Sequence, residues 1–488
     1  MLMIDVKSIN TAIFTPLFLA IGLAGASAND PAVNVSIQLD SGNCVLSWQA
    51  NDQASGYKIW FSENLIDGFQ LIDELADGSA ASWQQQLDFA CGFYKVEQLV
   101  DEVTTDPTTG FAAGSGTSDD PYQIAAAVHL QKLFSDSSLW GDSFKLTRNV
   151  SMAGVEVAAG VGTLEEPFSG EFDGNGFTIS GLAINQPEAS GVAMFSELYD
   201  ARISNVVMDE VNIVGWADVS ALAAYAEDSV IENCHVLGGS VTGVNAVGGV
   251  VGTLYYAEII SSSSAANITA TQTGIGGLVG AMYGSTGLVE DCWASGNVSS
   301  SNSYVGGLVG DASNEAVIRN SYATGKVTGW EFVGGLVGLA QRKCVIEYCY
   351  SSSDVSSVML AGKTSATRAG GLLGEAENST VQYCYAAGNV TGYEMVGGLL
   401  GSCYNTAITE CHSLAFVTAE TSVGGLLGVH ASGNLKRNYW SIDGSGQQSS
   451  AGSVTGLTAA EMAEQSSFVS WNASVWDFSG DYPVLIAQ

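Results

Sequence analysis

The chain has 488 residues, which is too long for one ordinary globular core and predicts several domains or an array of repeats. Its 50 Asp and Glu residues against 15 Lys and Arg residues give a formal net charge of −35. A surface this acidic repels nucleic acid and anionic membranes, and we therefore exclude both as partners.

Residues 1–28 follow the order of features in a secretory signal peptide. Lys7 supplies a positive charge, residues 11–25 form an apolar run, and Ala26-Ser27-Ala28 provides the small residues of a cleavage site. No later stretch is apolar for long enough to span a bilayer. We expect an exported protein without a transmembrane segment, which is extracellular, on the cell surface or periplasmic.

Residues 29–104 predict a small β-sandwich, because short alternating segments are separated by turns rich in Gly, Asp and Asn. Cys44 and Cys91 are placed to join two of its strands by a disulfide. Residues 105–113 have the composition of a linker. The region resembles a fibronectin type III-like module in the segments Leu46-Ser47-Trp48, Gly56-Tyr57-Lys58-Ile59 and Phe93-Tyr94-Lys95-Val96.

Residues 114–188 differ in character from the segments on either side. Residues 125–134 have the apolar spacing of a helix, and two strand-like segments meet at the tight turn Asp173-Gly174-Asn175-Gly176. The first strand of a solenoid leaves an open edge that invites aggregation unless it is covered. We therefore interpret residues 114–188 as the N-terminal cap of a solenoid.

The stretch Val305-Gly306-Gly307-Leu308-Val309-Gly310 recurs with small changes almost to the end of the chain. Each copy, roughly 28 residues long, contains three strand-like segments bounded by Gly or Asn. One copy is lengthened by residues 360–368, which we expect to form a loop. Two degenerate copies come first, and the clear copies begin at the Gly pairs of Gly248, Gly276, Gly306, Gly334, Gly370, Gly397 and Gly424.

Short, β-branched segments at a fixed period are typical of a β-solenoid. We predict an all-β fold, in which residues 189–440 form a right-handed parallel β-helix with three strands per rung and about nine rungs. Residues 441–488 would form its C-terminal cap. The small β-sandwich would precede the N-terminal cap.

The Gly pair predicts a bend within each repeat. In a straight strand, Val305 and Val309 would share one face and Leu308 would lie on the other, so that both faces would be apolar. We predict that the chain bends at the pair and buries both Leu308 and Val309, because Gly adopts corner conformations that other residues resist.

The repeat resembles the GLUG motif, which occurs in bacterial surface proteins and in some immunoglobulin A1 protease-like proteins. The resemblance rests on Gly-Gly-Leu-Val-Gly followed by Ile-x-Asn-Cys/Ser-Tyr-Ala-x-Gly-x-Val. It extends to the opening segment Asp120-Pro121-Tyr122 and the closing segment Asn438-Tyr439-Trp440. The resemblance implies a surface or adhesion-associated protein, and the repeats of the family carry no catalytic residues to transfer.

In-register stacking would turn each repeat position into a column along the rod. One column consists of small residues that suit a tight interior corner, where a free Cys behaves as a small apolar group. Metal ligation and disulfides between neighbouring rungs are the alternatives, but metal ligands converge on one point and this column spreads over the rod. Its members are Cys234, Ser263, Cys292, Ser321, Cys349, Cys384, Cys411 and Asn438.

The next position along the strand gives a mostly aromatic column, which alternation directs outward if the Cys column points inward. Stacking between rungs is the favoured interpretation. A platform for sugar rings or a surface for a protein partner is the alternative, which makes this column the candidate binding site. Its members are His235, Ser264, Trp293, Tyr322, Tyr350, Tyr385, His412 and Tyr439.

No catalytic motif accompanies the repeats. The few basic residues do not recur beside an acidic cluster, and neither a His-Glu-x-x-His nor a Gly-x-Ser-x-Gly sequence is present. We predict no catalytic residues, no metal and no cofactor. The expected function is an extended surface for adhesion, matrix or glycan interaction. The alternatives are a polysaccharide-active lyase or hydrolase with a groove near residues 360–368, and a purely structural envelope component.

Overall fold

The computed structural model describes residues 105–359 and 367–486, together with the strands between residues 20 and 99. The chain divides into two compact units, residues 1–104 and residues 105–488. Cys91, most of the predicted signal peptide and most of the inserted loop lie outside the described residues. The signal peptide therefore stays a prediction.

The strands of the first unit form two antiparallel sheets. Leu46, Ile59 and Trp83 of these strands are buried, as expected for the small β-sandwich that the sequence predicts. The fibronectin type III-like character stays a prediction. One sheet contains β1 (Ala20–Ile21), β2 (Val35–Asp40), β3 (Asn43–Trp48) and β6 (Ser82–Gln86), and the other contains β5 (Gln70–Leu75), β4 (Gly56–Ser62) and β7 (Phe93–Leu99).

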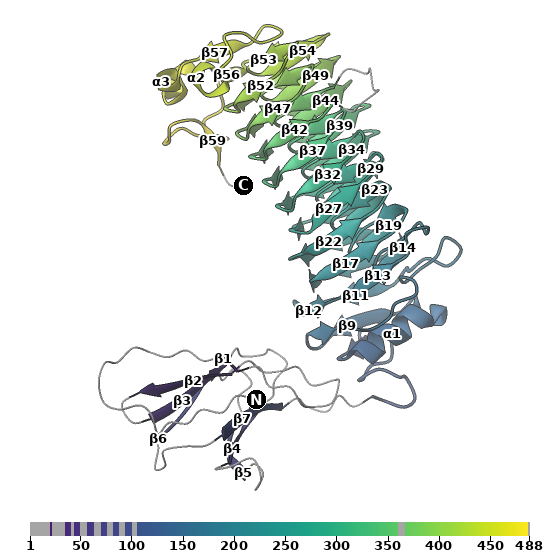
Figure 1. Ribbon diagram of the computed structural model, residues 1–488. Helices are drawn as coiled ribbons and strands as arrows, with labels where there is room; N and C mark the ends of the chain where they lie inside the picture. The colour runs from purple at the N-terminus through teal and green to yellow at the C-terminus, as the bar shows by residue number, and fades with distance from the viewer. Residues whose placement is uncertain are drawn as a thin grey trace. The chain divides into compact units, whose positions relative to one another are not determined.

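The second unit is a parallel β-solenoid, as predicted, and Figure 1 shows its strands stacked rung upon rung. Five parallel sheets, named D to H, run along it. Sheets F and G have nine strands each, in agreement with the predicted number of rungs, while sheets D and E have 12 strands because the ends of the solenoid extend them.

Each full rung has five short strands, so the prediction of three strands is wrong. The predicted segment 317–322 divides because Asn320 adopts a left-handed conformation, with φ of 50°, between two sheets. Asn tolerates this conformation better than most residues. One rung consists of β33 (Val305–Gly306) in sheet H, β34 (Val309–Ser313) in sheet F, β35 (Val317–Arg319) in sheet D, β36 (Tyr322–Ala323) in sheet E and β37 (Val327–Gly329) in sheet G.

The predicted bend at the Gly pair is confirmed. Val305, Leu308 and Val309 are all fully buried, and the chain leaves sheet H and enters sheet F across Gly307 and Leu308. The expectation that these positions need Gly for its special backbone conformations is wrong, because neither Gly306 nor Gly307 has a positive φ.

Close approach explains the glycines instead. A Cβ on Gly306 would lie 1.9 Å from the carbonyl oxygen of Val309. A Cβ on Gly307 would lie 2.1 Å from the carbonyl oxygen of Gly335 and 2.9 Å from the Cβ of Ala323 across the core. Only a residue without a side chain fits between these neighbours.

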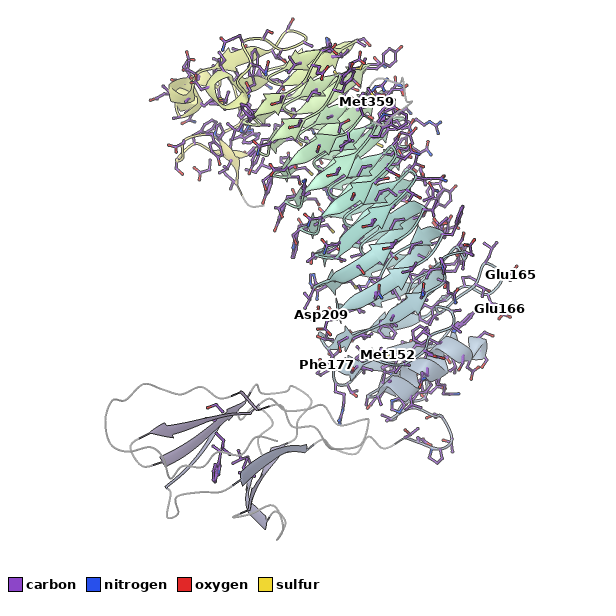
Figure 2. All side chains as sticks on the ribbon, in the orientation of Figure 1. Met152, Glu165, Glu166, Phe177, Asp209 and Met359 are labelled. Atoms are coloured by element: carbon purple, nitrogen blue, oxygen red, sulfur yellow. The ribbon has the colours of Figure 1, made fainter. Side chains whose placement is uncertain are left out.

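The N-terminal end of the solenoid carries β8 (Tyr122–Ile124), α1 (Ala127–Ser135) and β9 (Ser143–Leu146). The helix agrees with the predicted one. The turn at Asp173 does not join a hairpin, because β11 (Glu171–Asp173) belongs to sheet D and β12 (Thr178–Ser180) to sheet E. Glu165 and Glu166 project from the loop that precedes β11 (Figure 2).

The C-terminal end carries short elements that turn back beside the last rungs, as Figure 1 shows. A small core of Phe468, Trp471 and Trp476 holds them against sheet E. No helix in the described part of the chain is long and apolar enough to cross a membrane. The elements are α2 (Ile442–Ser445), β57 (Thr455–Leu457), α3 (Ala459–Met462), β58 (Trp476–Asp477) and β59 (Val484–Leu485).

Candidate binding surfaces

The predicted aromatic column lies on sheet E, with one correction of register. Ser263, and not Ser264, pairs with His235 on one side and Trp293 on the other. The small-residue column shifts likewise, since the backbone N–H of Cys234 donates to the hydroxyl of Ser262. Val207, and Thr178 before it, precede His235 in the same register. The strands that carry the rings are β21 (His235–Val236), β31 (Trp293–Ala294), β36, β41 (Tyr350–Ser351), β46 (Tyr385–Ala386), β51 (His412–Ser413) and β56 (Tyr439–Ser441).

The small-residue column points inward, as predicted. Its cysteines are free and buried, and their Sγ atoms contact main-chain carbonyl groups, as in the 3.1 Å contact between Cys292 and Glu290. Burial raises the pKa of the Cys234 and Cys292 thiols to about 12, so they are neutral packing groups. Cys344 and Cys403, outside the column, are also buried and free.

The rings of the aromatic column stack face to face. Tyr322 and Tyr350 have centroids 4.8 Å apart and an interplanar angle of 7°, and Tyr350 and Tyr385 have 5.0 Å and 6°. From Trp293 to His412 each ring therefore stacks on the next ring along the rod, whereas His235 is tilted by 35° against Trp293. A sugar platform needs free ring faces. The geometry accordingly favours the stacking interpretation over the platform.

The C-terminal segment covers the last rings of the column. Trp476 lies 5.3 Å from His412 and 6.3 Å from Tyr385 between ring centroids, and Trp471 lies 5.6 Å from Tyr439. His412 and Tyr439 are buried as a result. Of the seven ring-bearing residues predicted for binding, His235, Trp293, Tyr322 and Tyr350 stay half-buried and clear of this segment.

Polar contacts hold the segment in place. The carboxylate of Glu410, only 2% exposed, accepts from the backbone N–H of Asn472 and pairs with Arg437 at 2.6 Å. Arg437 also donates to the carbonyl of Ser470 at 2.9 Å. A buried carboxylate that is both paired and hydrogen-bonded costs little and fixes the position of its partners.

His412 makes the docking of this segment sensitive to acid. Burial lowers the pKa of His412 to about 3, and neither ring nitrogen has a hydrogen-bond partner. The pKa of His412 in the folded state lies below the unfolded value near 6.5. The contribution of neutral His412 to the free energy of unfolding is therefore fully present above pH 6.5 and is lost as the pH falls toward 3. At pH 5 the loss amounts to about 2 kcal/mol.

We expect His412→Phe to gain stability relative to the wild type on going from pH 7.5 to pH 5, by about 2 kcal/mol. Urea unfolding at the two pH values measures this, and the carboxylates shared by both proteins cancel in the difference. His235→Phe is the control, because His235 is only half-buried. We expect its gain in stability between the two pH values to be smaller than that of His412→Phe. Equal differences at both pH values would contradict the burial of a neutral His412.

A second surface, on sheet F, was missed in the sequence. Its outward positions place tyrosines beside carboxylates on the first rungs: Glu197 pairs with Tyr225, and Tyr199 pairs with Glu227, which pairs with Tyr255. We call this the tyrosine–acid face. It lies on β14 (Phe195–Tyr199), β19 (Ala223–Glu227), β24 (Val251–Tyr255), β29 (Val279–Tyr283) and β34, and at the corner residue Tyr256 directly after β24. Its members are Glu197, Tyr199, Tyr225, Glu227, Tyr255, Tyr256, Tyr283 and Asp311.

The rings of the tyrosine–acid face are tilted and do not form a continuous stack. Tyr225 and Tyr255 have centroids 6.4 Å apart at 30°, and Tyr255 meets Tyr256 edge-on at 71°. Tyr199 and Tyr256 are exposed. This face therefore leaves aromatic surface free for a partner, in contrast to the column on sheet E.

Among the described residues no cation acts on Glu197, whereas the charge of Arg342 acts on Asp311. Burial raises the pKa of Glu197 to about 7, and the charges of Asp218 and Glu227 add to the effect. Burial likewise raises the pKa of Asp311 to about 6, against hydrogen bonding from Gln341 and Tyr283. The sequence contains neither Lys nor Arg between Arg202 and Arg319. This long stretch without basic residues is the sequence signal that could have indicated an acidic face.

No group of three or more His, Cys, Asp or Glu side chains in the described residues is placed to hold a metal ion. The tyrosine–acid face carries carboxyl groups and the exposed rings of Tyr199 and Tyr256, which makes it a candidate binding surface. Its carboxyl groups with raised pKa are also the kind that acid–base chemistry uses.

Comparison with known proteins identifies the family of the repeats. The family model "The GLUG motif" matches residues 301–328, 333–356 and 365–391, so the chain carries GLUG repeats and the resemblance is confirmed. The chain is 32% identical to halomucin from Haloquadratum walsbyi over 170 aligned residues. The aligned region makes up 32% of this chain and 2% of halomucin.

Immunoglobulin A1 proteases share the same repeats. The chain is 37% identical over 144 residues to the protein from Streptococcus sanguinis, covering 28% of this chain and 8% of the protease. It is 27% identical over 251 residues to the protein from Streptococcus pneumoniae, and the aligned region makes up 48% of this chain and 12% of that protease. The chain thus spans only a small part of each of these relatives, and the similarity concerns a β-solenoid and not a whole protease.

Proposed function

We propose that this protein is an exported, non-catalytic β-solenoid that presents an extended surface for adhesion, by binding a glycan or a protein outside the cell. The observation that carries the proposal is the in-register stack, because it repeats outward side chains in rows along the rod. Such rows offer several contacts to one long partner. Similarity to halomucin and to immunoglobulin A1 proteases supports a location outside the cell.

Binding of the labelled full chain to a glycan array and to cells tests the proposal. We expect saturable binding in at least one assay, and competition by the unlabelled chain. The control is the chain unfolded in urea and diluted into the same assay, which keeps the composition and charge but loses the rows. Failure to bind in both assays, or equal binding by the unfolded control, would contradict the proposal.

A polysaccharide-active lyase or hydrolase is the second candidate, and the raised pKa values of Glu197 and Asp311 favour it. The predicted location beside the insertion is less suitable. There Arg368 binds Glu331 at 2.6 Å and Glu375 at 2.7 Å, so the cation is already paired. Release of reducing ends or unsaturated products from uronate or neutral polysaccharides, abolished by Glu197→Gln, would establish this function instead.

A further inference from the structure

The tyrosine–acid face has an uncompensated charge within an aromatic surface. Four carboxyl groups, those of Glu197, Asp218, Glu227 and Asp311, lie on or beside it, and the hydroxyl of Thr253 donates to Asp218 at 2.6 Å. No Lys or Arg is present in the sequence from residue 203 to residue 318. The cations at the two ends of this stretch are already paired, Arg202 with Glu232 and Arg319 with Glu290, and the charge of Arg342 acts on Asp311 alone among the four carboxyl groups.

Asp311 provides a second, independent sign of an unfilled site. Its side chain is only 8% exposed, and one carboxylate oxygen accepts from the Tyr283 hydroxyl at 3.3 Å. The other oxygen, Oδ1, is buried and has no hydrogen-bond partner, while Gln341 and the charge of Arg342 lower the pKa of the carboxyl group. Buried carboxylate oxygens usually have partners, so Oδ1 of Asp311 can accept from one further donor.

We propose that the tyrosine–acid face binds a Lys- or Arg-rich segment of a partner protein. Carboxylates pair with guanidinium and ammonium groups through charge-assisted hydrogen bonds, and tyrosine rings with free faces attract the same cations. The net charge of −35 steers such a segment toward the protein. The inference rests on the proposed binding function and specifies the class of partner.

Relief of repulsion among the carboxyl groups has a measurable consequence. A bound cation favours the ionised form of Glu197, whose pKa of about 7 leaves it partly protonated at neutral pH. Binding at pH 7 should therefore release a proton. A surface that bound a neutral glycan would not be expected to release one.

The experiment is isothermal titration of the full chain with octa-arginine at about 0.15 M salt, where long-range attraction is screened. We expect the double variant Glu197→Gln, Glu227→Gln to bind at least about tenfold more weakly, and Tyr255→Ala to bind several-fold more weakly. Titration in two buffers of different ionisation enthalpy detects the released proton in the wild type and its loss in the double variant.

The matched control is the double variant Asp209→Asn, Asp291→Asn, which removes the same charge from the sheet E side of the rungs. We expect its affinity to change less than about twofold. Equal weakening by both double variants would show non-specific attraction and overturn the inference, as would no binding of octa-arginine. The glycan and cell assays use other ligands, so they test the proposed function separately.

Discussion

Gly307→Ala should destabilise the solenoid by about 3 kcal/mol, because the added Cβ would lie 2.1 Å from the carbonyl oxygen of Gly335. The next rung would have to move away, and hydrogen bonds between the rungs would lengthen. Ala323 blocks movement in the other direction, since its Cβ lies 2.9 Å from the same position. Chemical unfolding followed by circular dichroism measures the loss.

Gly141→Ala is the control for this effect. Gly141 has no positive φ, and the nearest atom to its added Cβ is the Ser169 hydroxyl oxygen at 3.9 Å, an ordinary contact. We expect its stability to stay within about 0.5 kcal/mol of the wild type. If the two variants were equally stable, close approach would not explain why the second Gly of the motif recurs.

Trp476→Ala should release the C-terminal segment from the solenoid, with a cost of about 3 to 5 kcal/mol. Trp476 is 1% exposed and packs against the rings of Tyr385, His412 and Trp471. Its loss would expose the end of the aromatic column. Hydrogen exchange should then show lost protection in residues 455–486, while the earlier rungs stay protected, because rungs interact with their neighbours only.

Trp216→Ala is the matched control, since it removes the same side chain from a position that is 44% exposed. We expect a change of less than about 1 kcal/mol and full protection of residues 455–486. Unchanged exchange in Trp476→Ala would mean that the polar contacts of Glu410 and Arg437 hold the segment without the tryptophan.

Much of the fold could be predicted because the sequence repeats at a regular spacing. The Gly pair returns at near-constant spacing, and the β-branched segments between the pairs can only form short strands. The number of strands per rung could not be read in the same way. It depends on left-handed corner residues such as Asn320 and Tyr348, and a Tyr in that conformation has no sequence signal.

The candidate site was predicted less well, and the reasons differ. Gly248 is 14 residues before Ser262, whereas Gly276 is 16 residues before Cys292, because the corner between sheets F and D varies in length. Counting from the Gly pair therefore misplaced Ser263 by one position. Covering of His412 by Trp476 joins residues 64 positions apart, which no repeat pattern contains.

The sequence by itself determined the solenoid, the inward cysteines and the stack of rings, since each follows from the side-chain type at a repeated position. Tertiary structure alone decided which surface is open to a partner. It turned the ring faces of sheet E toward one another, covered their end with the C-terminal segment, and placed the tilted tyrosines of sheet F beside carboxyl groups with raised pKa. The physical reason is that accessibility depends on the packing of distant segments, which the composition of one repeat does not contain.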